Sequence, residues 1–154
     1  MSNYRRALEF HLRIGDAPPA RPTRPGPAVV ALRSRLLREE AAEALEALAA
    51  LPDAADGAAA LAAAAHELAD LLYVTYGTFV ALGVDADAAF AEVHDANLRK
   101  AGAPRRDDGK QLRPPGWRPA DLAEVVARQL RGADQGRHIE ALRTPEGTGG
   151  GGDR

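Results

Sequence analysis

The sequence has no cysteine, one methionine, one tryptophan and only 5% aromatic residues over its 154 positions. The absence of cysteine excludes a disulfide-stapled scaffold, a thiolate zinc site and a cysteine nucleophile, and it fits a reducing compartment. Charge of one sign is not in excess either, because 20 Lys and Arg residues are offset by 22 Asp and Glu residues. The net charge of -2 argues against a nucleic-acid partner, since the usual mark of such proteins is a strong basic excess.

Long hydrophobic runs are missing as well. No apolar segment reaches the roughly 20 residues that span a bilayer, and residues 1–6 are not followed by the apolar stretch of a secretory signal. We therefore expect no membrane partner and a cytoplasmic location. The length itself suits one domain, which is large enough to bury a core without disulfide or metal staples.

The residues that are abundant favour helices. Alanine, leucine, glutamate and arginine dominate, most of residues 41–65 are alanine, and no segment alternates β-branched or aromatic residues as a strand does. The sequence therefore predicts an all-α fold, an antiparallel bundle of about four to five helices. The expected helices cover about residues 4–14, 28–51, 58–82, 86–100 and 119–130.

Particular residues mark the expected helix ends. Asp56 and Asp85 are suited to N-caps, because a short side-chain oxygen can accept from the free N–H groups of the first turn. Gly15 and Gly83 follow apolar helical patterns, as C-terminal glycines do. Pro119 is expected at the first position of the last helix, where its missing N–H costs nothing.

The chain divides into a helical domain and an extension. Residues 1–131 contain all the expected helices, and within them residues 16–28 carry five prolines, which predict an extended connector. Residues 132–154 form a C-terminal extension. From about residue 144 its composition is rich in glycine, so we expect a flexible tail there.

The helix expected over residues 28–51 places three carboxylates beside its apolar stripe. At 100° per residue, Glu40 and Glu43 share a flank with Leu36, and Glu39 lies one ridge further round. In the helix expected over 58–82, Glu67 and Asp70 form a second pair three residues apart. The stripe of the first helix that we expect to face the core consists of Leu37, Ala44, Leu48 and Leu51.

Clustered carboxylates repel each other, and desolvation beside a core adds a further cost. Two kinds of partner would relieve it. One is arginine, since Arg33, Arg35 and Arg38 lie on the same helix as three of the acids. The other is a divalent cation such as Mg²⁺ or Mn²⁺, which takes oxygen ligands and bridges carboxylates to phosphates. The residues alone leave both readings open, together with a simple solvated face.

The order of the motifs resembles a known family. Glu40-Ala-Ala-Glu43 is followed after 23 residues by Glu67-Leu-Ala-Asp70, and then by the segments 90–100 and 108–121. This ExxE…ExxD pattern is similar to that of the MazG-like all-α nucleoside triphosphate pyrophosphohydrolases, most of all the bacterial MazG-like dUTP diphosphatases. The resemblance covers about residues 4–131.

The resemblance implies a metal-dependent hydrolase. Glu40, Glu43, Glu67 and Asp70 would hold two or three Mg²⁺ ions, for which Mn²⁺ would substitute, and Glu39 would hold a further ion or orient the attacking water. Glu39 and Glu40 are therefore the expected catalytic acids. The implied reaction is hydrolysis of the α–β phosphoanhydride, which gives a nucleoside monophosphate and pyrophosphate, with dUTP as the favoured substrate in nucleotide-pool house-cleaning.

The resemblance also points to residues that would contact the substrate. Residues 99–118 contain seven basic and two acidic residues, and a basic segment of this kind suits a triphosphate. Lys100 would take a phosphate and Asn97 the sugar or base, and Lys110 is a second phosphate candidate. By their chemistry alone, Tyr76 could lie under the sugar and Trp117 could stack on the base, although packing is the more usual role of each ring.

Other readings remain at this point. A di-iron carboxylate bundle requires Glu-x-x-His pairs, and no histidine has a glutamate three residues before it. A helical interaction module with solvated acids would have no enzymatic activity. Within the family, dCTP, a modified or damaged nucleotide, or phosphoribosyl-ATP are alternative substrates. The resemblance implies a homodimer, with a tetramer as the alternative.

Overall fold

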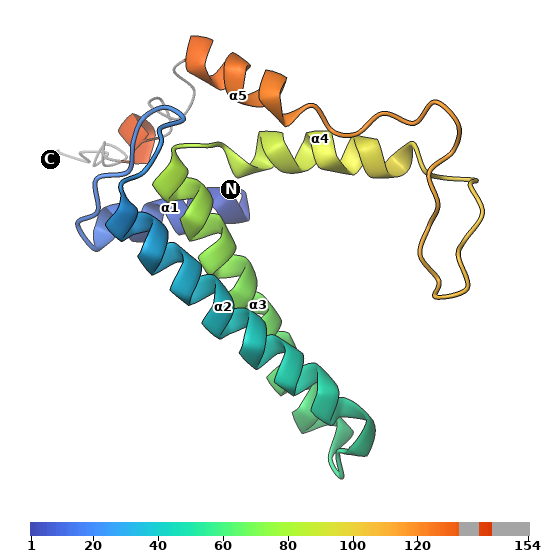
Figure 1. Cartoon of the computed structure of the whole chain (residues 1–154). Helices are drawn as coiled ribbons and strands as arrows, with labels where there is room; N and C mark the ends of the chain where they lie inside the picture. The colour runs from blue at the N-terminus through green and yellow to red at the C-terminus, as the bar shows by residue number, and fades with distance from the viewer. Residues whose placement is uncertain (133–138, 143–154) are drawn as a thin grey trace, which may run out of the picture.

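The computed structural model describes residues 1–132 and 139–142. Within those residues the chain has no β-strand element, and its one strand-like pairing is an isolated bridge between Arg105 and Gln111. The all-α prediction is therefore confirmed. In chain order the helices are α1 (Asn3–Arg13), α2 (Pro27–Ala50), the short 3-10 helix η1 (Leu51–Asp53), α3 (Gly57–Leu82), α4 (Ala86–Leu98) and α5 (Leu122–Arg131) (Figure 1).

The helix ends follow the expected capping chemistry, with one exception. The side chain of Asp56 accepts from the N–H groups of Ala58 and Ala59, and Asp85 caps α4 in the same way. Gly83 ends α3 in the left-handed region with φ 68°. Pro119, however, does not begin the last helix. The helix starts three residues later, because the Asp121 side chain accepts from the N–H of Glu124 and caps it there.

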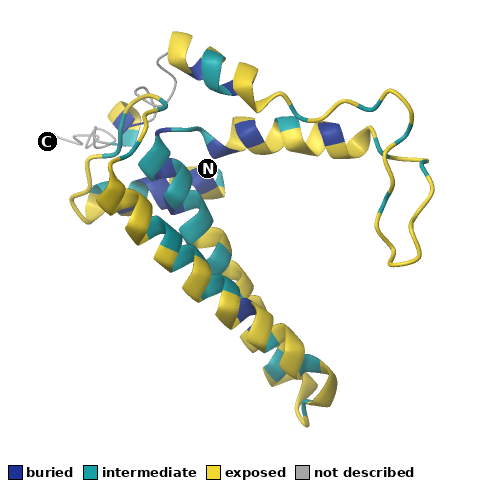
Figure 2. Cartoon of the chain, in the orientation of Figure 1, coloured by how far each residue is buried: buried dark blue, intermediate teal, exposed yellow. Residues whose placement is uncertain are grey.

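Helices α2 and α3 form a long antiparallel hairpin, and α1 packs across the end of α3 that is near the connector (Figure 1). The main apolar core lies at this end, around the fully buried side chains of Tyr4, Leu8 and Val80 (Figure 2). Ile139 also belongs to this core and is 7% exposed. The extension expected from residue 132 onward therefore contributes to the domain core, while its residues 133–138 and 143–154 lie outside the described part.

The Pro-rich connector is fastened to the end of α3. The N–H of Thr23 donates to the carbonyl of Leu82 over 2.8 Å. The backbone of Arg21 lies so close to Gly83 that a Cβ at position 83 would overlap the Arg21 carbonyl group. Gly83 is thus required both by its positive φ and by this close approach.

Helices α4 and α5 form an arm that leaves the hairpin. They pack on each other, and Figure 1 shows them running away from α2 and α3. The loop between them folds back on itself through the bridge between Arg105 and Gln111, with Gly109 at φ 82°. Within the described residues, the expected bundle thus consists of the α2–α3 hairpin, which α1 crosses, and the separate α4–α5 pair.

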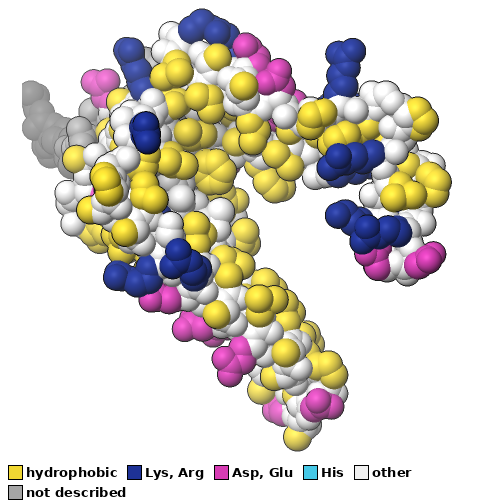
Figure 3. All heavy atoms as spheres, viewed as in Figure 1, with side chains coloured by type: hydrophobic (Ala, Val, Ile, Leu, Met, Phe, Trp, Pro, Cys, Tyr) yellow, Lys and Arg dark blue, Asp and Glu magenta, His cyan; other side chains and the backbone are white. Residues whose placement is uncertain are grey.

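Large apolar side chains are exposed on the hairpin and on the arm. Leu45 is 68% exposed, Leu61 63% and Phe90 68%. Leu48, expected in the core stripe of α2, is 40% exposed, whereas Ala44 on the same stripe is buried. Hydrophobic side chains border the concave side between hairpin and arm (Figure 3). The core stripe predicted for α2 is therefore confirmed at Ala44, whereas Leu48, nearer the far end of the helix, stays exposed.

One helix is long and apolar enough, by length and composition, to cross a membrane. This is α3, with a mean hydropathy of 1.2 over its best 18-residue stretch. Every 18-residue stretch of α3 contains both Glu67 and Asp70, and carboxylates are costly at bilayer depth. The observation is weak evidence for a membrane span, and the expectation of no membrane partner stays a prediction.

A candidate metal centre on the hairpin

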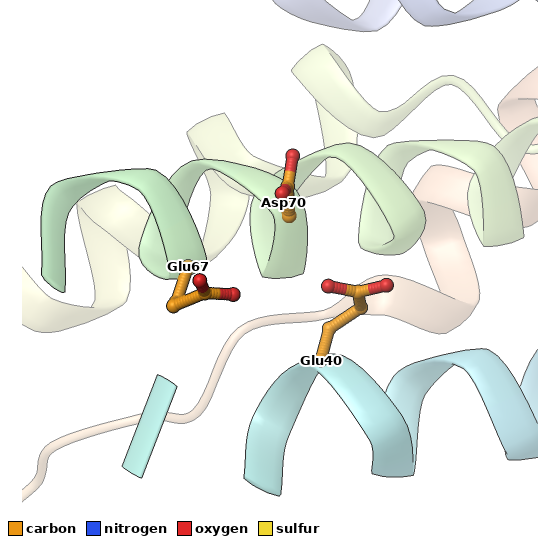
Figure 4. A group of neighbouring side chains, drawn as sticks. All are labelled: Glu40, Glu67 and Asp70. Atoms are coloured by element: carbon orange, nitrogen blue, oxygen red, sulfur yellow. The ribbon is translucent and has the colours of Figure 1, made fainter. Parts of the chain in front are cut away.

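Three carboxylates meet between the two helices of the hairpin. Glu40 projects from α2, and Glu67 and Asp70 project from α3 (Figure 4). One oxygen of each lies within 4.8 Å of an oxygen of the other two, and all three side chains are partly buried. The pairing of the helices arises from their small residues, since Ala44 and Ala64 are both buried and allow a close approach.

The electrostatics of Glu40 connect all five predicted acids. The pKa of Glu40 is raised above its ordinary value, first by partial desolvation and then by the charges of Glu43, Asp70, Glu67 and Glu39. Each of the other four acids is thus close enough to disfavour the ionised form of one carboxyl group. The structure therefore brings the five residues together as one negative cluster.

Glu39 and Glu43 lie at the outer side of this cluster. Both are exposed, and Glu39 forms an i,i+4 pair with Arg35, whose Nε is 3.7 Å from Oε1. This is the only ion pair between an arginine and any of the five acids within residues 1–132 and 139–142. Arg35 therefore offsets the charge of one exposed acid at the edge of the cluster. The oxygens of Glu40, Glu67 and Asp70 have no arginine partner among the described residues.

A histidine that was not among the predicted site residues also reaches the cluster. His66 Nε2 lies 3.3 Å from Oδ2 of Asp70, one helical turn along α3. The four-residue spacing of the two residues is the sequence signal that would have found it. Because the ring is exposed, it can release Asp70 to another partner without leaving a buried polar group.

The donor set suits a hard divalent cation. Carboxylate oxygens from two rigid helices are the ligands that Mg²⁺ and Mn²⁺ take, and several metal positions remain for water or phosphate. A cation between Glu40, Glu67 and Asp70 would also cancel the repulsion that raises the pKa of Glu40. The arrangement can therefore hold a metal next to a phosphate ester or anhydride.

The predicted substrate residues of the arm do not lie at this cluster in the same chain. Asn97 and Lys100 are at the end of α4, where Lys100 Nζ donates to Asn97 Oδ1 over 2.6 Å. Trp117 donates from Nε1 to the carbonyl of Ala96 over 2.7 Å. The charged groups of Lys100 and Arg113 lie over its ring, 5.2 and 4.5 Å from the centroid. A stacked base would have to displace one of these cations.

Lys110 and Tyr76 are placed differently from each other. Lys110 is exposed in the loop of the arm, where its backbone N–H donates to Asp108 Oδ1 over 3.1 Å. Tyr76 packs on the apolar core of Tyr4 and Leu8, on the side of α3 away from Glu67. The structure therefore gives Tyr76 a packing role and does not bring it to the carboxylates.

Comparison with known proteins supplies one match. The sequence profile of the family described as "PRA-PH: Phosphoribosyl-ATP pyrophosphohydrolase" matches residues 7–97. The matched segment contains all five acids and ends at Asn97, so that Lys100, Lys110 and Trp117 lie beyond it. A search of curated proteins finds no match.

Proposed function

Because the chain belongs to the phosphoribosyl-ATP pyrophosphohydrolase family, an all-helical nucleotide pyrophosphohydrolase family related to the MazG superfamily, we propose that it is a Mg²⁺- or Mn²⁺-dependent hydrolase of a nucleoside triphosphate. It would cleave the α–β phosphoanhydride and release a nucleoside monophosphate and pyrophosphate. The observation that carries the proposal is the meeting of Glu40, Glu67 and Asp70 oxygens within 4.8 Å.

Each acid has a place in this proposal. Glu40, Glu43, Glu67 and Asp70 bind the cations and set their spacing, because they project from two helices that pack firmly together. Glu39, at the outer edge, accepts a proton from the attacking water or holds a further ion. Bound divalent ions supply the general chemistry of such sites, namely a more acidic water and a positive clamp on phosphate oxygens.

The exposed apolar faces support a homodimer. Soluble monomers rarely leave a large contiguous apolar patch uncovered, and here the far half of the hairpin and the concave side of the arm are both exposed. Two hairpins packed face to face would close a four-helix bundle. The arm of one subunit would then carry Asn97 and Lys100 toward the carboxylates of the other, which one chain alone does not achieve. A tetramer is the alternative assembly.

The proposed substrate is dUTP, on the strength of the motif pattern quoted from the sequence. The family match favours phosphoribosyl-ATP as a second candidate, since that substrate gives the family its name. Pyrophosphate release from a panel of nucleotides that includes dUTP, dCTP, ATP and phosphoribosyl-ATP decides between them. Faster turnover of any of the others would overturn the choice of dUTP.

Two substitutions test the metal centre itself. Asp70→Asn and Glu43→Gln remove one charge each with almost no change of shape, so we expect pyrophosphate release to fall to background while the helical circular dichroism spectrum is kept. Glu46→Gln is the matched control, because Glu46 is an exposed acid of α2 outside the cluster, and its activity should equal that of the unchanged protein. An Asp70→Asn variant with full activity would refute the metal centre.

A helical interaction module with no enzymatic activity is the rival reading. Thermal melting with Mg²⁺ or Mn²⁺, against a control of equal ionic strength, separates the two, because a bound ion stabilises the folded state by mass action. The melting temperature of the unchanged protein should rise and that of Asp70→Asn should not. Equal melting temperatures in all four samples would favour the interaction module.

A further inference from the structure

A second site with polar side chains lies at the connector end of the hairpin. A pocket of about 460 Å³ opens beneath the Pro-rich connector, between α1, α2 and α3. Its walls are mostly apolar, formed by prolines of the connector and by Val29, Leu32 and Val80. Four of its lining side chains carry charge or titrate, namely His11, Asp16, Arg24 and Arg33, and of these Arg24 is exposed. Apolar walls with a few converging polar groups are typical of small-molecule sites.

The histidine of this pocket already has a hydrogen-bond partner. His11 is 5% exposed, and its Nδ1 lies 2.6 Å from Oδ2 of Asp16. An ionised carboxylate only accepts hydrogen bonds, so Nδ1 carries the proton and donates to Asp16. Nδ1 therefore has no lone pair to offer to Arg33, although Nη2 of Arg33 is 3.5 Å away.

Arg33 is consequently left without an acceptor. Its Nε is buried and has no hydrogen-bond partner, and no carboxylate lies within ion-pair distance of the guanidinium in the part of the chain that the structure describes. Burial lowers the pKa of Arg33, and the charge of Asp16 offsets this effect only in part. A buried donor without an acceptor destabilises the folded protein, and a ligand that supplies an acceptor would remove that cost.

Gly77 makes room for this arrangement. A Cβ at position 77 would lie 2.7 Å from His11 Nε2 and 2.9 Å from Arg33 Nη1. Any other residue at this point of α3 would therefore push the guanidinium or the imidazole out of position. Glycine at this position therefore allows Arg33 and His11, which line the pocket, to lie close together.

The pocket and the carboxylates share one face of the hairpin. Arg33 precedes Glu40 by seven residues on α2, and Gly77 follows Asp70 by seven on α3. Seven residues are two helical turns, so both pairs lie on the same side of their helices and about 10 Å apart. This spacing suits a molecule whose phosphates lie at the carboxylates and whose other end lies near Arg33.

We propose that this pocket binds the nucleobase of the substrate and that Arg33 selects a base with a carbonyl edge. This inference rests on the proposed function, whose phosphate end it extends. The connector prolines and Val29, Leu32 and Val80 cover the faces of a planar ring, and the guanidinium donates to its carbonyl oxygen. A guanidinium donates hydrogen bonds and cannot accept them, so an amino group at the same position of the base would place two donors opposite each other with no acceptor between them. The pocket therefore favours uracil and other keto bases over adenine.

The test compares Arg33→Met with Arg38→Met in the full chain. Arg38 is an exposed arginine of the same helix with no ion pair among the described residues, so it controls for lost charge. In Arg33→Met we expect KM for dUTP to rise about tenfold or more, as for loss of one charged hydrogen bond. The preference for dUTP over dATP should fall by a similar factor, and the midpoint of a Mn²⁺ titration should not move. Arg38→Met should keep both values.

A second variant probes the same pocket without removing a charge. Gly77→Ala should raise KM for dUTP and erode the base preference, because its methyl group displaces Arg33 and His11. Gly57→Ala is the control, since a Cβ at that helical position meets nothing within 4 Å. If Arg33→Met and Gly77→Ala both fold and both keep the KM and base preference of the unchanged protein, the inference is wrong while the proposed hydrolase stands.

A binding measurement tests the same pocket independently of catalysis. Deoxyuridine, which has no phosphate, is titrated calorimetrically into the metal-free protein, and inorganic phosphate is titrated in parallel. Binding of deoxyuridine that Arg33→Met abolishes supports the inference even if no nucleotide is hydrolysed. Binding of phosphate alone, or of neither probe, overturns it, because the guanidinium would then serve a free anion or only the fold.

Discussion

The two ends of the α2–α3 hairpin are built differently. At the connector end, α1, the prolines and Ile139 enclose the helices, and Tyr4 and Leu8 are fully buried. At the far end, the same two helices expose Leu45 and Leu61 by more than 60% each. Among residues 1–132 and 139–142, the first end therefore has an enclosed core and the second end does not.

The carboxylates lie between these two ends, so each end affects them in a different way. The enclosed end holds α2 and α3 in a fixed register, which sets the spacing of Glu40, Glu67 and Asp70. The open end leaves apolar side chains exposed, which is where the proposed second subunit would pack. Under the proposed function, the difference between the ends means that one chain positions the expected cation ligands, whereas the residues expected to bind phosphate would come from a partner chain.

The largest expected effect comes from breaking the enclosed end. Leu8→Ala should lower the free energy of unfolding by about 2–5 kcal/mol, as for other buried leucines, because it leaves a cavity in the core. Urea denaturation measures the loss, which should not depend on protein concentration. Leu45→Ala is the counterpart at the open end, where the change should weaken association and its effect should grow on dilution. A concentration-independent loss of the same size for Leu45→Ala would contradict the contrast.

A smaller effect is expected where the connector meets α3. Gly83→Ala should destabilise the protein by at least the 1–2 kcal/mol that a left-handed residue costs, and by more because its Cβ overlaps the Arg21 carbonyl group. Gly102→Ala separates the two causes, since Gly102 also has a positive φ, 80°, but its Cβ would meet nothing within 4 Å. Thermal melting of both variants measures the difference. Equal losses would show that the connector is not held against Gly83.

The smallest expected effect is a pH dependence of the protein's stability, and it arises at Glu40, which lies between the two ends of the hairpin. The pKa of Glu40 is higher in the folded protein than in the unfolded chain, so folding favours its protonated form. Below the pKa that Glu40 has in the unfolded chain, the carboxyl group is protonated in both states and does not destabilise the folded protein. The destabilisation appears as the pH rises above about 4.5 and through the pKa of the folded state. In metal-free protein, Glu40→Gln should therefore raise the melting temperature by a few degrees near neutral pH, and the gain should vanish in acid.

The control for this measurement is Glu46→Gln, because Glu46 is exposed and lies outside the cluster. It should leave the melting temperature unchanged at both pH values. A gain for Glu40→Gln that is as large in acid as at neutral pH would show that charge repulsion is not its cause. Added Mg²⁺ should reverse the sign at neutral pH, since the unchanged protein then gains a ligand that the variant lacks.

Much of the local structure and the acid cluster could be predicted from the sequence, for physical reasons. The caps at Asp56 and Asp85 depend on residues two and three positions away, and the five acids lie on two helices whose spacing is regular. The prediction that Pro119 begins the last helix is wrong because Asp121, two residues later, caps the helix, which starts at Leu122. The packing of Tyr76 and Ile139 on the core around Tyr4 and Leu8 could not be predicted, because these partners lie in α1, which is distant in the sequence.

By itself, the sequence determined the all-α fold, the order of the helices and the two acidic motifs, because helix propensity, capping and the 3.6-residue period act over a few residues. Only the tertiary structure decided which ends of those helices are enclosed, that α4 and α5 leave the hairpin, and that Arg33, His11 and Gly77 meet beneath the connector. Those outcomes depend on contacts between segments more than twenty residues apart, whose energies no local pattern records.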